Sequence, residues 1–128
     1  MNRTIATLAA AAVLLTACTP VLINPIEAGP APSNYRAAIR SYIVENFRDP
    51  YSLRDVTVTQ PVAGGLRFRQ GWVVCLRLNA RNAMGGYTGP QHTSFLFQGD
   101  QIVASADQAE ALACQTVAYQ PWPEIEGH

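Results

Sequence analysis

The fold is decided by residues 93–105, whose sequence is Thr-Ser-Phe-Leu-Phe-Gln-Gly-Asp-Gln-Ile-Val-Ala-Ser. Gly99 and Asp100 separate two apolar runs and suit a two-residue turn, in which glycine readily supplies a positive φ. The stretch therefore predicts an antiparallel β-hairpin of two strands, residues 93–98 and 101–105. The expected cross-strand partners are Phe97 with Ile102 and Phe95 with Ala104, so that apolar side chains meet.

Alternation with a period of two also marks strands before this hairpin. Residues 56–59 alternate valine with threonine, residues 66–69 alternate apolar residues with arginine, and a long run over 72–80 follows. In that run three large aliphatic side chains share one face and Cys75 lies on the other. Gly64-Gly65, ahead of the alternating residues, predicts a turn.

A helix is predicted before the first strand. Ser33 or Asn34 suits the N-cap, and apolar side chains recur at helical spacing from Tyr35 to Phe47. Pro50 ends the helix because its ring disfavours helical geometry at the residue before it. The helix is therefore amphipathic, with one face available to cover the sheet.

The sequence after the hairpin completes the predicted domain. Asp107, with Glu110 three residues later, has the spacing of a capping box and predicts a short helix to Ala113. Residues 33–122 are thus expected to form one α+β domain. In it the N-terminal amphipathic helix packs on an antiparallel sheet of about four strands, a short C-terminal helix follows, and residues 123–128 form a tail.

The first 17 residues have the composition of an export signal. Arg3 supplies a positive charge, and the apolar stretch from Ile5 to Leu15 is shorter than the about 20 residues that span a bilayer. The stretch ends in Leu15-Thr16-Ala17-Cys18, which resembles the lipobox of bacterial lipoproteins. The resemblance implies cleavage before Cys18 and lipidation of its thiol and new amino group, and several acyl chains together anchor a protein stably.

Two further features concern the membrane. By the same resemblance, Thr19 after the lipidated residue points to the outer membrane, because aspartate at that position commonly retains lipoproteins at the inner one. Residues 18–32 contain Pro20, Pro25, Pro30 and Pro32, a density that favours an extended tether over a helix. The domain is therefore expected to stand off from the bilayer on this tether.

Cys75 and Cys114 remain once Cys18 is lipidated. A pair in an oxidising compartment predicts a disulfide, with two buried free thiols as the alternative. The chain contains no Cys-x-x-Cys motif, so a redox-active pair is not expected. Because Cys75 faces away from the aliphatic side of its strand, we expect the helix on that aliphatic side and the segment after Ala111 across the cysteine side.

The most distinctive segment is Asn79-Ala80-Arg81-Asn82-Ala83-Met84-Gly85-Gly86-Tyr87-Thr88-Gly89. One hypothesis is a recognition loop that presents donors and an aromatic surface to a glycan or a protein. The alternative is a structured turn, in which glycines meet backbone needs and asparagine side chains cap the turn. The candidate interaction residues are Asn79, Arg81, Asn82 and Tyr87.

Three of these patterns together carry a second resemblance. The chain has Asp49-Pro50-Tyr51-Ser52 after its first helix, then Cys75 on a strand, then the segment just quoted. It is similar in this to small uncharacterised proteobacterial envelope proteins with Asp-Pro-x-Ser and Asn-Ala-basic-Asn…Gly-Gly-Tyr-x-Gly motifs. Met84 departs from that pattern, which has phenylalanine there. The resemblance implies a shared fold unit and assigns no activity.

Charge and metal-ligand content exclude several classes. Nine arginines and nine acidic residues balance, with no lysine, so the chain lacks the basic patch that nucleic-acid binding needs. His92 and His128 are the two histidines, too few for a zinc site with suitable spacing. We therefore expect no nucleic-acid partner, no metal and no cofactor.

Catalytic motifs are also absent from the sequence. Ser94 lies two residues from His92, but no Gly-x-Ser-x-Gly elbow is present, and turns or caps account for most acidic residues. No catalytic residue is assigned. The expected function is that of a non-enzymatic interaction or structural module of the envelope, anchored to the periplasmic side of the outer membrane through Cys18. The alternatives are a small-ligand or glycan binding module and a cell-wall hydrolase.

Overall fold

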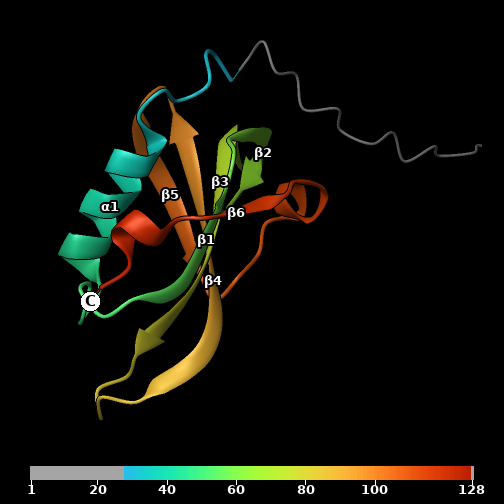
Figure 1. Cartoon of the computed structure of the whole chain (residues 1–128). Helices are drawn as coiled ribbons and strands as arrows, with labels where there is room; N and C mark the ends of the chain where they lie inside the picture. Colours follow the sequence, from blue (N-terminus) through green and yellow to red (C-terminus); the bar gives the residue numbers. More distant parts are fainter. Residues whose placement is uncertain (1–27, 128) are drawn as a thin grey trace, which may run out of the picture.

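The computed structural model describes residues 28–127 of the chain (Figure 1). The export signal, Cys18 and the first part of the tether lie outside the described residues, as does His128. The expectations about cleavage, lipidation and anchoring therefore stay predictions. None of the helices within residues 28–127 is long and apolar enough to cross a membrane.

One antiparallel sheet of six strands forms the body of the protein, with the order β5-β4-β3-β1-β6 and with β2 paired to β3. The strands are β1 (Arg54–Thr59), β2 (Val62–Leu66), β3 (Arg69–Arg81), β4 (Tyr87–Gln98), β5 (Gln101–Asp107) and β6 (Tyr119–Pro121). The prediction of about four strands was wrong, because it missed β2 and β6. β6 has only three residues and ends in a proline, so it carries almost no alternation.

The pair Gly64-Gly65 explains why β2 was missed. These glycines lie inside β2, and a Cβ at Gly64 would stand 2.7 Å from the Cβ of Ala113. Glycine is needed there for close packing and not for a turn. The turn falls instead at Arg67 and Phe68, whose φ angles are 49° and 64°. Side chains that large rarely adopt positive φ, which costs on the order of 1–3 kcal/mol per residue. The strand expected over residues 66–69 was therefore wrong, because β2 ends at Leu66 and β3 begins at Arg69.

A single α-helix, α1 (Tyr35–Asn46), covers one face of the sheet (Figure 1). Its buried side chains Ile39 and Ile43 pack with the aliphatic face of β3 and with two phenylalanines of β4. Trp122 completes this main core. The prediction that the helix packs on the face opposite Cys75 is confirmed.

The predicted C-terminal helix was wrong. Asp107 is the last residue of β5, and Glu110 turns toward the sheet instead of capping a helix. Residues Leu112–Thr116 form a short 3-10 helix, η1, which crosses the second face of the sheet. Cys114 in η1 is bonded to Cys75 in β3, with Cα atoms 6.0 Å apart. The predicted disulfide is therefore confirmed, and so is the crossing of the cysteine face.

The hairpin of β4 and β5 differs from its predicted register. Phe97 does pair with Ile102, but Ala104 pairs with Leu96 and not with Phe95. Val103 is an extra residue at this point, so the strand is bulged and the partners shift by one. A bulge cannot be foreseen from the turn residues alone, because the turn fixes only the first pairs.

Contacts continue beyond the predicted domain boundaries of residues 33 and 122. Pro32 is buried, and the Gly29 carbonyl accepts a hydrogen bond from Trp72 Nε1 at 3.1 Å. At the other end, η2 (Pro123–Ile125) follows β6, and Glu126 Oε1 accepts a hydrogen bond from the Val56 amide at 2.7 Å. Both flanking segments therefore pack against the sheet.

Candidate functional site

The candidate segment forms a hairpin that extends past the rest of the sheet. β1 pairs with β3 only as far as Asn79, and β5 pairs with β4 only as far back as Thr93. Residues 79–90 are here called the β3–β4 arm, and beyond Asn79 its strands pair only with each other. Figure 1 shows this arm projecting from the body of the domain.

The tip of the arm is held by its own asparagines. Asn82 Oδ1 accepts hydrogen bonds from the amides of Met84 at 2.9 Å and Gly86 at 3.0 Å. Asn79 Oδ1 accepts one from the Gly89 amide at 3.1 Å. Both amide oxygens thus bind the backbone of the arm, in the manner of Asx turns.

Tyr87, which pairs with Arg81 next to the turn of the arm, fastens the arm to the body of the domain. Its hydroxyl donates a hydrogen bond to the Ser52 carbonyl at 2.8 Å. The guanidinium carbons of Arg54 and Arg81 lie 4.2 Å and 5.3 Å from the centre of its ring, distances at which cations attract aromatic faces. The structure brings together the predicted Arg81 and Tyr87, and it adds Arg54 and Ser52. These two residues lie more than 30 positions before Tyr87, and no local sequence pattern indicated that they contact it.

An apolar side chain stands at the tip of this fixed arm. Met84 is 92% exposed, so it gains nothing from burial within the domain. Its thioether chain is flexible and polarisable, which suits binding surfaces. The arm thus combines a rigid backbone with one adaptable apolar contact.

A cavity of about 280 Å³ lies beside the arm, between the end of α1 and the end of β5. Amide, hydroxyl and carboxylate groups make up much of its wall, together with Tyr42 and Phe47. Tyr87 is not part of the wall. The lining residues are Tyr42, Asn46, Phe47, Ala80, Arg81, Asn82, Thr88, Gln91, Thr93, Asp107 and Gln108.

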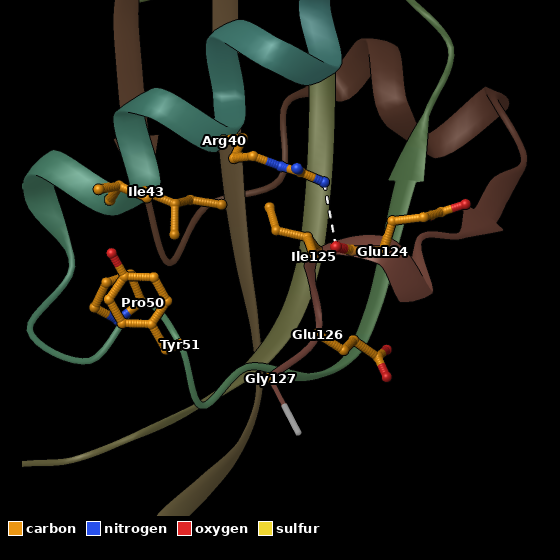
Figure 2. A pocket seen from close by; sticks show the side chains of 9 residues that line it. Arg40, Ile43, Pro50, Tyr51, Glu124, Ile125, Glu126 and Gly127 are labelled. Atoms are coloured by element: carbon orange, nitrogen blue, oxygen red, sulfur yellow. Dashed lines mark hydrogen bonds between the residues drawn. The ribbon is translucent and has the colours of Figure 1, made fainter.

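A second cavity, of about 340 Å³, is bounded by α1, the loop at Pro50 and the C-terminal segment. Figure 2 shows Arg40 reaching across to the Glu124 carbonyl, a hydrogen bond of 3.2 Å. Ile43 and Ile125 form the apolar part of its wall. Gly127 also lines this cavity.

A polar cluster lies on the disulfide face, centred on Glu110. Glu110 Oε1 is 3.0 Å from Arg77 Nη2 and accepts a hydrogen bond from the Tyr119 hydroxyl at 2.6 Å. His92 Nδ1 is 3.9 Å from the same oxygen. The hydrogen bond from Tyr119, helped by Arg77, lowers the pKa of Glu110, while burial raises the pKa of Tyr119.

The cluster joins the segment after β5 to three strands, since Arg77, His92 and Tyr119 belong to β3, β4 and β6. Ser94, which lies near it, is buried; its hydroxyl donates to the Ala109 carbonyl and accepts from the Ala111 amide. Sequence reasoning missed this cluster because it treated Glu110 as a helix cap. Within residues 28–127, no three potential metal ligands gather into a binding arrangement.

Comparison with known proteins gave no match among protein-family models, curated proteins or solved structures. The site is therefore interpreted from its own geometry.

Proposed function

We propose that the chain is a lipid-anchored periplasmic protein of the outer membrane that binds an envelope protein through its β3–β4 arm, without catalysis. The anchor rests on the lipobox resemblance at Leu15–Cys18. The recognition role rests above all on Met84, an apolar side chain 92% exposed at the tip of an arm whose backbone is fixed by hydrogen bonds. A fixed arm binds with little loss of conformational entropy.

The arm also explains why the partner should be a protein. A single thioether on a narrow two-stranded projection fits into an apolar pocket of a larger surface. Arg81 lies nearby and is exposed, so it can pair with a carboxylate at the rim of such a pocket. Methionine and arginine are both enriched in protein interfaces relative to the rest of the surface.

A photo-crosslinking amino acid in place of Met84 tests this proposal in intact cells. We expect one adduct with a different envelope protein, and no such adduct when the same amino acid replaces Leu112, which is 80% exposed on η1. Met84→Asp should abolish capture of the identified partner without lowering the melting temperature, because exposed substitutions usually change stability by less than about 0.5 kcal/mol. Absence of an adduct, or one of twice the chain's own mass, would contradict partner binding by the arm.

The anchor has a separate test. Cys18→Ser should abolish labelling by a palmitate analogue and give a protein that is either uncleaved or soluble. Continued labelling of this variant would show that the lipid lies elsewhere.

The cavity beside the arm favours a second candidate, binding of a glycan. Amides and hydroxyls beside two aromatic rings are suited to sugar hydroxyls. Titration of peptidoglycan fragments should shift the amide signals of Asn46 and Gln91, and Gln91→Ala should weaken the binding. If no fragment shifts these signals, the cavity is not a glycan site.

A further inference from the structure

The turn between β2 and β3 presents a side chain that the fold does not use. Phe68 is fully exposed, and both it and Arg67 have positive φ. Asparagine and glycine adopt this conformation with little strain, whereas arginine and phenylalanine are strained in it. The backbone therefore holds an aromatic ring out into solvent at the tip of a tight turn.

Two arginines flank Phe68 in the chain, Arg67 before it and Arg69 after it. Arg67 Nε donates to the Ser105 carbonyl at 2.6 Å, and Arg69 Nη1 donates to the Val103 carbonyl at 3.1 Å. Neither arginine belongs to a salt bridge within residues 28–127. Each guanidinium has five N–H donors, so most of them stay available for an anion. An exposed aromatic side chain with an arginine on each side of it in the sequence suits the interface of a bilayer that contains anionic phosphates.

The chain enters the domain at the same end. Gly29 is bonded to Trp72, and the Ser33 amide donates to Asp100 Oδ1 at 2.8 Å. Gln98 Nε2 donates to the Gln70 carbonyl at 3.2 Å, so the β4–β5 turn lies close to the start of β3. Figure 1 shows the first described residues, the β2–β3 turn and the β4–β5 turn at one end of the domain, with the arm at the other.

The length of the tether restricts how far this end can be from the membrane. An extended chain spans at most 3.3–3.6 Å per residue, so the ten steps from Cys18 to Ala28 cover at most about 35 Å. A lipid at Cys18 therefore keeps Ala28 within about 35 Å of the anchored residue, so the β2–β3 turn can reach the bilayer surface. A weak contact there is strengthened by the high effective concentration that the tether gives.

We propose that the β2–β3 turn docks on the anionic membrane leaflet to which the protein is anchored. Phe68 enters the boundary between headgroups and acyl chains, and Arg67 and Arg69 bind lipid phosphates. Asp100, the acidic residue of the neighbouring turn, accepts the hydrogen bond from Ser33. The docked domain directs the arm away from the membrane. This inference rests on the lipid anchor proposed above.

The test uses the lipidated mature protein in vesicles of phosphatidylethanolamine and phosphatidylglycerol. Cys75 and Cys114 are bonded, and Cys18 is lipidated, so a cysteine introduced by Gln70→Cys is the free thiol for an environment-sensitive fluorophore. We expect a blue-shifted emission that brominated lipids quench. The same label at Met84→Cys, in the arm, should emit as in water and stay unquenched.

A second variant separates docking from folding. Arg67→Asn/Phe68→Gly removes the strain of the turn, so the melting temperature should rise while lipid quenching of the label at position 70 is lost. A fall in melting temperature would show that these side chains are structural.

The remaining outcomes distinguish membrane docking of the β2–β3 turn from the lipid anchor and from other occupants of the turn. If the parent protein floats with the vesicles while its label at position 70 stays aqueous, docking is refuted and the anchor stands. If the protein does not float, the anchor fails and docking with it. Blue-shifted emission that lipids do not quench would indicate a second copy or another protein on this turn, and equal quenching in neutral phosphatidylcholine vesicles would refute the role of the arginines.

Discussion

Replacing Cys75 and Cys114 together by alanine is expected to lower the free energy of unfolding by about 4 kcal/mol. The two residues are 39 positions apart, and the chain-entropy relation for a loop of about that length gives roughly 4 kcal/mol at 25 °C. For a domain of this size each kcal/mol shifts the melting temperature by about 4–8 °C, so the expected fall is about 15–30 °C. Few single features of a small domain contribute as much.

The structure also says where the loss should appear first. Cys114 lies in the small second core, with Val73, Leu96 and Ala111, while the main core lies on the other face of the sheet. Without the bond, the segment that includes η1 keeps mainly the contacts of Glu110 and Ser94. Its amides should then exchange with solvent well before those of β3 and β4.

Thermal unfolding followed by circular dichroism, with amide exchange by mass spectrometry, measures both effects. The oxidised parent protein is the first control, and the parent protein treated with a reductant is the second, with reduction verified by thiol titration. A fall of less than about 5 °C in both the double variant and the reduced protein would refute the entropic argument. Simultaneous exchange of η1 and β3 would refute the proposed order.

Three further outcomes follow from contacts in the structure. Gly64→Ala should cost about 1–3 kcal/mol of stability, because its Cβ would crowd Ala113. Gly86→Ala should be nearly neutral, since its Cβ would stand 3.8 Å or more from the side chain of Asn82, and urea unfolding compares the two variants. Asn82→Ala should leave global stability within about 1 kcal/mol but raise amide exchange of Met84 and Gly86, as two hydrogen bonds are lost; unchanged exchange would mean that other contacts hold the tip. The pKa of Glu110 is lowered by folding from 4.5, so its stabilising effect is complete above pH about 4.5 and is lost as the pH falls through the lower folded value. Glu110→Gln should therefore flatten the stability profile on the acid side of pH 4.5, and an unaltered profile would show that other carboxylates dominate there.

The local sequence pattern was enough to predict the parts of the fold that follow from alternating apolar and polar side chains. The two faces of β3 followed from the residues around Cys75, and with them the positions of the helix and the disulfide. These predictions succeeded because a strand with both faces buried fixes the side of every neighbour. The strand count failed where local signals were ambiguous, as at Gly64, whose need for glycine comes from Ala113, 49 positions later.

The candidate site was only partly predictable for the same reason. The segment from Asn79 to Gly89 stood out by composition, and its asparagines act within the segment, where sequence distance is short. The contacts of Tyr87 with Arg54 and Ser52 depend on the pairing of β1 with β3, which no local pattern encodes. The Glu110 cluster likewise needs the path of the chain after β5.

The hydrogen bonds from Arg67 and Arg69 occupy two backbone carbonyls of β5, an edge strand of the sheet. Three strands of the sheet have only one partner: β5, β6, which is three residues long and contains Pro121, and β2, which is five residues long and contains two glycines. Short edge strands and covered edge carbonyls are features that protect sheets from edge-to-edge aggregation. If the proposed anchor gathers many copies in one leaflet, they should therefore collide without pairing their sheets edge to edge.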